Sequence, residues 1–454
     1  MDMTSGNPYQ LIFSFSIPLL IGNIFQQLYN MVDSIVVGNF VGEKALAAVG
    51  TCFPVIFMLV SLFMGIGIGA SVMVSQYFGA RDYDSIQKTV STIYTATVVG
   101  CIPLTIIGVL VSRPLLLLMK VPDDGTLEMA EIYMIVIFIG IVGTLGFNIN
   151  SGILQGLGDS RTSLFFLMIA TIINIILDLL FTLAFHWGTM GVALATIIAQ
   201  ICSWIFGIFF INRRFSFLKI RPLSFHFDRQ IFAKAMKLGI PSGIQQALFS
   251  IGIMAMQSLV NSYGSNFMAG FNGANKLDSF AFMPIQSFAS AVTTYTGQNI
   301  GAGKVDRVKS GVRAGIVLSV GFSIGIGLIV YPLSGVLMQM FNRNPEIISS
   351  GVNYLHCVLP FYSILAMMFL LNAVQRGAGE TLVPLFSSLI SLWLARVPCA
   401  YAISYLFGPE YMYLSYAVGW ILGLAITYFF FRRGKWKEKA ITSERFSPDK
   451  VPES

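Results

Sequence analysis

Long apolar stretches recur along the whole chain and constrain its fold more than any other feature. About 20 consecutive, mainly apolar residues cross a bilayer as a helix, and the 454-residue chain holds twelve such stretches. They cover approximately residues 10–38, 47–77, 88–112, 128–156, 162–184, 189–212, 234–262, 268–299, 312–334, 347–375, 383–406 and 412–432. Charged residues make up only 11% of the chain, against roughly 25% in soluble proteins. The sequence therefore predicts an all-α polytopic membrane protein with twelve transmembrane helices, and it excludes soluble enzymes and disulfide scaffolds.

The basic residues predict how the chain is oriented in the membrane. With both termini on one side, that side receives most of the 28 Lys and Arg residues, chiefly in the linker after the sixth stretch and in the tail. The other side receives only Lys44, Arg113, Lys120 and Arg343. The positive-inside rule then places both termini in the cytoplasm, in a cell (inner or plasma) membrane. Because the net charge of +7 is explained by topology, no nucleic-acid partner is expected.

The chain also repeats itself. Residues 71–84 read SVMVSQYFGARDYD and residues 293–306 read TTYTGQNIGAGKVD. In this alignment Gln76 pairs with Gln298, and upstream Pro18 pairs with Pro241 at nearly the same offset. Two six-helix halves follow, and because six is even, both halves enter the membrane in the same direction. Such parallel repeats, related by a pseudo-twofold axis along the membrane normal, are typical of transporters whose substrate path lies between the halves.

This repeat predicts the domain organisation. We expect an N-terminal six-helix lobe over 1–212, a basic cytoplasmic linker over 213–233, a C-terminal six-helix lobe over 234–432, and a disordered cytoplasmic tail over 433–454. Pro18 and Pro241 occupy equivalent places in the first span of each lobe. Because a proline inside a helix removes a backbone hydrogen bond, both are candidate hinges, together with the glycine cluster at 65–69.

Polar side chains inside the first lobe predict an ion site. Intramembrane carboxylates are expensive and indicate function by default, and Asp33 and Asp178 lie deep in the first and fifth stretches. Asn174 stands four residues before Asp178 and so shares its helix face. Two carboxylates and a carboxamide suit either Na⁺ or a proton held on a carboxyl group. The same pocket is expected to include further polar residues of the first and fourth stretches, as candidates for a substrate cavity: Gln26, Asn30, Asn148 and Gln155.

The second lobe has a different set of polar residues. Candidates for the substrate cavity there are Gln246, Gln257, Lys276, Asp278 and Arg396. Lys276 and Asp278 are two residues apart and cannot face each other on a helix. Arg396 either pairs with Asp278 in a structural ion pair or lines the transport path, and the sequence leaves both interpretations open.

No pattern indicates catalysis or a resident metal. The five cysteines form no CxxC pair and the three histidines are scattered, unlike the closely spaced ligands of a zinc site. No Ser–His pair or GxGD motif lies in a predicted span. We therefore expect neither an enzymatic activity nor a cofactor.

Several motifs resemble those of the multidrug and toxic compound extrusion (MATE) transporters over about residues 10–432. The resemblance rests on IPLLIGNIFQQLYNMVDSIVVG in the first stretch, SQYFGARD and GQNIGAGK in the repeat, QGLGDSRTSL, NIILD and GVALATIIAQ. It implies export of bulky, mostly cationic organic compounds by antiport with H⁺ or Na⁺, by a protein expected to be monomeric.

The resemblance also implies which residues carry the coupling ion. Asp33, Asn174, Asp178 and Thr196 match the first-lobe cation motif of the DinF-like branch. The NorM-like branch has carboxylates in the seventh and tenth spans, where this chain has Gln257 and no acid. An alternative is a flippase for a lipid-linked cell-envelope precursor. Such a protein is expected to have a strongly cationic cavity, but the only cations in the predicted spans here are Lys276 and Arg396.

Overall fold

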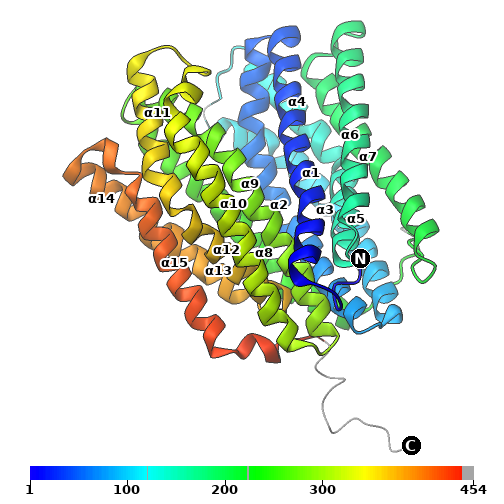
Figure 1. Cartoon of the computed structure of the whole chain (residues 1–454). Helices are drawn as coiled ribbons and strands as arrows, with labels where there is room; N and C mark the ends of the chain where they lie inside the picture. The colour runs from blue at the N-terminus through cyan, green and yellow to red at the C-terminus, as the bar shows by residue number, and fades with distance from the viewer. Residues whose placement is uncertain (120, 222–223, 442–454) are drawn as a thin grey trace, which may run out of the picture. The chain divides into compact units, whose positions relative to one another are not determined.

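The computed structural model describes residues 1–119, 121–221 and 224–441, which form helices and loops (Figure 1). The helices of the first half are α1 (Pro8–Val36), η1 (Val37–Val41), α2 (Glu43–Gly79), α3 (Tyr83–Leu118), α4 (Thr126–Ile139), α5 (Ile141–Gly156), α6 (Ser160–Leu179), η2 (Leu180–Ala184) and α7 (Gly188–Arg214). Those of the second half are α8 (Arg229–Asn261), α9 (Ser265–Gly301), α10 (Val305–Gln339), α11 (Pro345–Val358), η3 (Leu359–Phe361), α12 (Tyr362–Gly377), α13 (Leu382–Leu389), η4 (Ile390–Arg396), α14 (Val397–Phe407), η5 (Pro409–Tyr411), α15 (Leu414–Arg433) and η6 (Lys435–Glu438).

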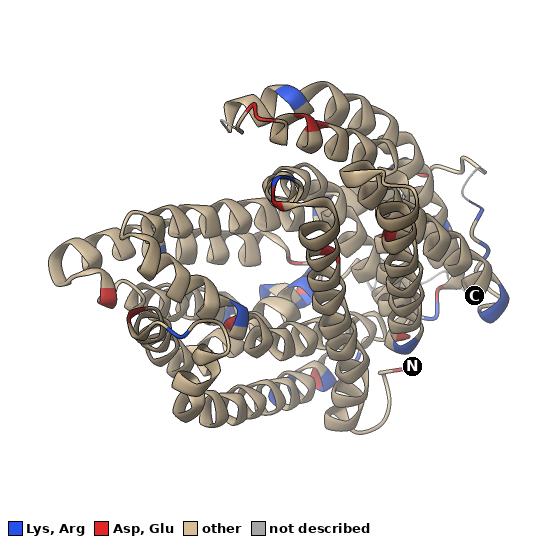
Figure 2. Cartoon of the chain, turned by 90° about the horizontal axis from the view of Figure 1, so that it is seen from above, with Lys and Arg blue, Asp and Glu red and all other residues tan. Residues whose placement is uncertain are grey.

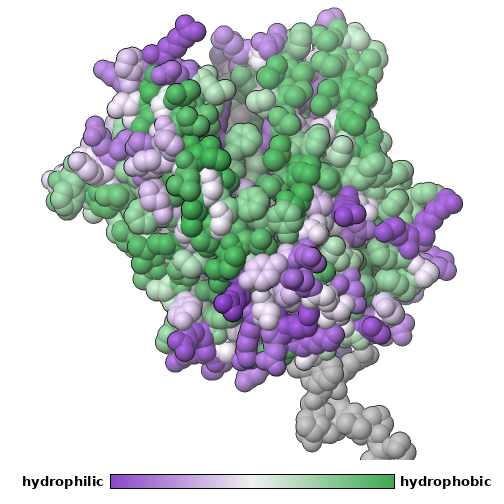
Figure 3. Space-filling model, in the orientation of Figure 1, coloured by the Kyte–Doolittle hydropathy of each residue, from purple (hydrophilic) through white to green (hydrophobic). Residues whose placement is uncertain are grey.

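The helices confirm the predicted all-α polytopic membrane fold. Within the described residues, ten helices are long and apolar enough to span a membrane, and the α4–α5 pair, bent by 53°, makes an eleventh candidate. We assign α9 as the twelfth span, because it has 37 residues and coincides with the eighth predicted stretch, although its mean hydropathy is lowered by polar side chains. The visible faces of the helices carry mainly apolar side chains (Figure 3), and charged residues occupy little of the ribbon (Figure 2).

The chain forms two compact units. The first comprises Met1 and Ile21–Gly243, and the second comprises Asp2–Leu20 and Ile244–Ser454. The boundaries therefore fall inside α1 and α8, and the basic linker predicted over 213–233 belongs wholly to the first unit. Packing explains this division: Ile12 and Phe15 of α1 are fully buried in an apolar cluster of the second unit.

The start of the tail is folded. Lys435–Glu438 forms a short 3₁₀ helix, so the disorder expected over 433–454 does not apply to these residues. The ring of Trp436 is buried and stacks on Phe431 at 5.5 Å, and its indole N–H donates to the Phe431 carbonyl at 3.0 Å. Burying a large ring with its N–H satisfied stabilises this turn. The rest of the predicted disordered tail, 442–454, lies outside the described residues.

Glycines in α2 allow a close helix crossing. A Cβ built on Gly65 would lie 2.3 Å from the backbone oxygen of Gly239 and 2.5 Å from the backbone nitrogen of Gly243, and one on Gly69 would lie 2.7 Å from the Ala235 oxygen. The two helices thus each present a pair of glycines four residues apart, as in the GxxxG packing of membrane helices. Gly65 and Gly69 therefore serve packing here, where α2 runs as one helix over Glu43–Gly79, and their role as bending points stays a prediction.

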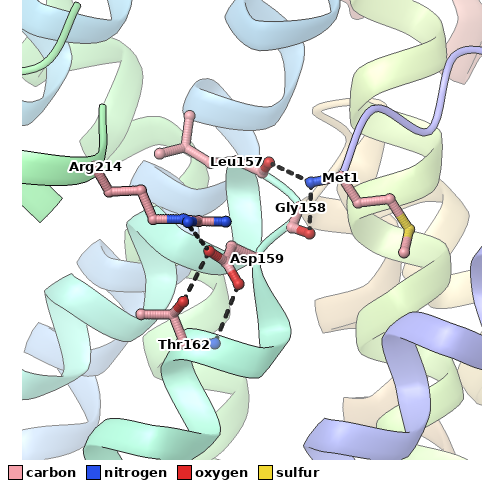
Figure 4. A network of polar contacts seen from close by, with 6 residues as sticks. All are labelled: Met1, Leu157, Gly158, Asp159, Thr162 and Arg214. Atoms are coloured by element: carbon pink, nitrogen blue, oxygen red, sulfur yellow. Dashed lines mark hydrogen bonds and ion pairs between the residues drawn. The ribbon is translucent and has the colours of Figure 1, made fainter. Parts of the chain in front are cut away.

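A polar network holds the start of α6 (Figure 4). Asp159 caps this helix: its carboxylate accepts from the backbone N–H of Thr162 at 3.1 Å and from the Thr162 hydroxyl at 2.8 Å. The guanidinium of Arg214, at the end of α7, lies 3.4 Å from the same carboxylate. The amino group of Met1 donates to the Gly158 carbonyl at 3.0 Å. One side chain therefore connects the helix that carries Asn174 and Asp178 to α7.

We expect Asp159→Ala to lower the free energy of unfolding by about 0.5–2 kcal/mol, the usual cost of losing a helix cap. The exposed contact to Arg214 adds little, because surface ion pairs are screened by water. The check is the thermal unfolding of purified protein. Asp159→Asn, which keeps the capping oxygen, should be close to the parent, and equal losses for both variants would contradict the capping role.

Candidate functional site

Asp33 and Asp178 meet inside the first unit. Asp33 lies near the end of α1 and Asp178 near the end of α6, and the two carboxyl groups are close enough to act electrostatically on each other. Asp178 is fully buried, whereas Asp33 is half-buried. Two carboxylates at such close range repel each other unless a cation or a proton lies between them. The structure therefore brings together the two acids that the sequence singled out in this lobe.

The other two predicted ion-site residues lie beside this pair. The Asn174 amide nitrogen is 3.4 Å from the Thr196 hydroxyl oxygen, which joins α6 to α7. The hydroxyl of Tyr29 lies 3.3 Å from the same Thr196 oxygen and joins α1 to them. Asn174 is buried, with 1% of its surface exposed. Three helices thus place Asp33, Asn174, Asp178 and Thr196 in one cluster.

Four oxygen atoms of this cluster are unsatisfied. Among the described residues, Asp33 Oδ1, Asn174 Oδ1 and both carboxylate oxygens of Asp178 are buried and have no hydrogen-bond donor. Buried polar atoms without a partner are rare and costly. Oxygen ligands of this kind suit a hard cation, and a shared proton would serve two facing carboxylates equally. The arrangement can therefore bind and release a small cation.

Two features of the site could not be predicted from the sequence. First, Tyr29 and Tyr133 lie within electrostatic range of Asp33, although neither stands out in an aromatic-rich chain. Second, each acid is followed by a π-helical segment, η1 after Asp33 and η2 after Asp178. Such segments occur often at functional sites, because they interrupt the regular backbone hydrogen bonds. The amino-acid pattern of a π-helix is not distinct enough to predict it.

The cavity candidates of the first unit lie on two helices. Gln26 and Asn30 are exposed on α1, as a surface lining a water-filled space requires. Asn148 on α5 donates from its amide to the Thr144 carbonyl at 2.8 Å, which uses part of its hydrogen-bonding capacity within its own helix. Gln155, near the end of α5, is half-buried. Within the part of the chain that the structure describes, none of the four forms a hydrogen bond with Asp33 or Asp178, so their role in a cavity stays a prediction.

The second unit contains a separate charged cluster. Arg396 is buried and its guanidinium lies 3.3 Å from the ring centre of Tyr416, a close cation–π contact. Asp278 is near enough to act electrostatically on this guanidinium, but within the described residues its Oδ1 atom and Arg396 Nε have no hydrogen-bond partner. The two residues therefore form a loose charge pair without direct contact, and Arg396 ends the π-helix η4.

The remaining candidates of the second unit are dispersed. Lys276 is exposed and its ammonium lies 5.9 Å from the ring centre of Phe341. Gln257 donates to Asn261 at 2.8 Å within α8, and Gln246 is half-buried on the same helix. The neighbouring Gln245, which the sequence did not single out, donates to Ser388 at 2.6 Å and accepts from Arg376 at 3.4 Å. Within the described residues, none of these side chains forms a hydrogen bond with Arg396.

A double-mutant cycle tests the electrostatic link between Asp278 and Arg396. Removing one charge leaves the other buried without a counter-charge, which is costly. We expect Arg396→Gln to destabilise the protein more in the parent than in the Asp278→Asn background, with a coupling energy of about 0.5–3 kcal/mol. Thermal unfolding of the parent, the two single variants and the double variant measures it. Additive losses of stability would show that the two charges do not interact.

The chain is similar to known proteins in sequence and in fold. The MatE family model matches residues 18–180 and 241–402, once in each half of the chain. The probable multidrug resistance protein YpnP of Bacillus subtilis (strain 168) is 30% identical over 448 residues, which cover 98% of this chain and 99% of that protein. The probable multidrug resistance protein NorM of Thermotoga maritima is 26% identical over 454 residues and covers 96% of this chain and 94% of its own length. A solved outward-facing multidrug resistance MATE family transporter of the MOP superfamily is similar in fold, with a TM-score of 0.88 at 24% identity, over 96% of this chain and 98% of that one.

Proposed function

Since the chain belongs to the MatE family of membrane transporters, we propose that it exports bulky, mostly cationic organic compounds in exchange for H⁺ or Na⁺. Two relatives that match almost the whole chain are named as probable multidrug resistance proteins. The chain is a multi-pass transporter and not an enzyme. Coupling to an ion is the part of the proposal that the site must support.

The observation that carries the proposal is the cluster of unsatisfied oxygens around Asp33 and Asp178. It supports a coupling site because a bound cation relieves the repulsion between the facing carboxylates, and this repulsion returns when the cation leaves. The same residues can take either H⁺ or Na⁺, so the coupling ion is left to experiment. We place this site in the DinF-like pattern, with Asn174 and Thr196 as its uncharged members.

The mechanism is antiport by alternating access. A cation that enters from outside relieves the repulsion between Asp33 and Asp178 and favours one conformation of α1. Pro18, which lacks a backbone N–H, gives this helix a point at which it bends, and Pro241 offers the equivalent point in α8. Transport in one direction requires that the two facing states differ in cation affinity and in substrate affinity.

We place the transporter in the cell membrane as a monomer, with both termini in the cytoplasm. The positive-inside pattern of the loops supports this orientation, and the linker after α7 carries several exposed basic residues. A lipid bilayer and a small organic molecule are then its only partners, and no nucleic acid is involved.

The flippase alternative is less well supported. A pyrophosphate headgroup needs several free cations in a cavity. Two cations lie within the spans predicted from the sequence. The guanidinium of Arg396 makes a cation–π contact with the Tyr416 ring, and Lys276 lies near Phe341.

The proposal is tested with purified protein in liposomes loaded with a fluorescent organic cation. A pH gradient and a Na⁺ gradient are imposed separately, and protein-free liposomes serve as the control. Movement of the compound driven by one gradient establishes antiport and identifies the ion. Movement under neither gradient, with flipping of a lipid-linked precursor in the same vesicles, would favour the alternative.

A further inference from the structure

Two described parts of the segment that joins α7 to α8, residues 215–221 and 224–228, are anchored within the first unit, and we call them together the strap. We propose that this strap is a binding surface for anionic phospholipids of the cytoplasmic leaflet, formed by Lys219, Arg221, Phe225, Phe227 and Arg229. The inference rests on the proposed orientation of the termini, and it is independent of the exported compound and of the coupling ion.

Hydrogen bonds from α3 hold the strap in place. The amide of Gln87 donates to the Lys219 carbonyl at 2.9 Å and accepts from the Lys219 N–H at 2.7 Å. The hydroxyl of Thr95 donates to the His226 carbonyl and that of Thr92 accepts from the Asp228 N–H, both at 3.1 Å. A linker that served only to connect two helices would not need such regular backbone anchoring.

Over residues 218–221 the strap alternates between buried and exposed side chains. Leu218 and Ile220 are buried, with 0% and 3% of their surfaces exposed, whereas Lys219 and Arg221 are exposed. In an extended segment successive side chains point to opposite sides. The strap therefore uses its apolar side to bind the protein and presents its basic side outward.

Two phenylalanine rings are exposed on the surface, and one of them has a strained backbone. Phe225 and Phe227 expose 57% and 51% of their surfaces. Phe225 also has a positive φ of 47°, in the left-handed region that bulky residues rarely adopt. Unfavourable backbone held at an exposed aromatic ring indicates a function for that ring. Aromatic rings of this kind favour the boundary between lipid headgroups and chains.

The cationic groups of the strap are free to bind a ligand. Within the described residues, the side chains of Lys219, Arg221 and Arg229 have no acidic partner, whereas Arg214 nearby is paired with Asp159. Hydrophilic side chains gather where α7 ends (Figures 1 and 3). Exposed cations next to exposed aromatic rings, between two membrane-spanning helices, match the phosphate and the glycerol–chain boundary of an anionic lipid. Charge complementarity thus favours a lipid over an acidic protein.

Native mass spectrometry of the full-length protein in detergent tests the proposal, with equal amounts of phosphatidylglycerol and phosphatidylcholine added. We expect the parent to retain phosphatidylglycerol preferentially. The triple variant Lys219→Gln, Arg221→Gln, Arg229→Gln should lower its affinity by up to about a hundredfold, since each basic residue near a surface contributes roughly fivefold. The matched control removes three exposed cations of the second unit, Lys309, Lys435 and Lys437, by the same change to Gln, and should retain the lipid.

A second variant separates lipid binding from folding. Phe225→Gly removes the ring and suits the left-handed backbone, so it should leave the melting temperature unchanged or raised while lipid retention falls. Equal losses for the linker and control triple variants would overturn the proposal, because they would indicate unspecific attraction. Displacement of the lipid by glycerol phosphate at equal concentration would also overturn it, since the surface would then recognise a soluble anion. Unchanged retention in both linker variants would exclude the strap as the site.

Discussion

Asp33→Asn is expected to abolish ion-coupled export while leaving the fold largely intact. The amide has nearly the shape of the carboxylate, but it cannot ionise, so the repulsion with Asp178 that a cation must relieve is lost. In the liposome assay the gradient-driven movement of the organic cation should fall to the level of protein-free vesicles. Asp178→Asn should act in the same way, because the two carboxyl groups act electrostatically on each other.

A suitable control for this experiment is Asp306→Asn. Asp306 is an exposed carboxylate whose oxygen lies 3.0 Å from Lys309 in a surface pair, and pairs of this kind contribute little. The control should export at the parental rate and unfold at the parental temperature. Normal coupled export by Asp33→Asn would remove this residue from the ion site, and the charged cluster at Asp278 would become the next candidate.

Gly65→Val is expected to have the largest effect on stability. Its Cβ would lie 2.3–2.7 Å from backbone atoms of Gly239 and Gly243, and backbone atoms cannot rotate away as a side chain can. Overpacking typically costs about 1–3 kcal/mol, and a rigid backbone contact places this variant at the upper end. Thermal unfolding monitored by size-exclusion chromatography should show a clear fall in melting temperature.

Gly50→Val provides the matched control on the same helix. No atom lies within 4 Å of a Cβ built at Gly50, so Val meets no clash there, and its helix propensity is slightly better than that of Gly. If Gly65→Val were as stable as Gly50→Val, α2 and α8 would not cross as closely as the structure has them.

The sequence predicted the number and the type of the helices with little ambiguity. Water and lipid impose length and apolarity on every span, so each span can be recognised from its own residues. The residues of the proposed ion site could also be predicted, since Asp33 and Asp178 are conspicuous in apolar helices and Asn174 shares a face with Asp178. Local rules were sufficient for these features, and the resemblance to a family added Thr196.

Only the tertiary structure decided how these helices are used. The repeat predicted two lobes that meet in the linker, yet the compact units divide inside α1 and α8, because buried contacts such as those of Ile12 and Phe15 lie far along the chain. From the sequence alone, the glycines of α2 were candidate bending points. In the structure they form a packing surface against α8. In the sequence the linker was only a signal of topology, whereas in the structure hydrogen bonds from α3 anchor it at Lys219 and Asp228. A local pattern determines what a segment can be, and contacts between distant segments determine what it does.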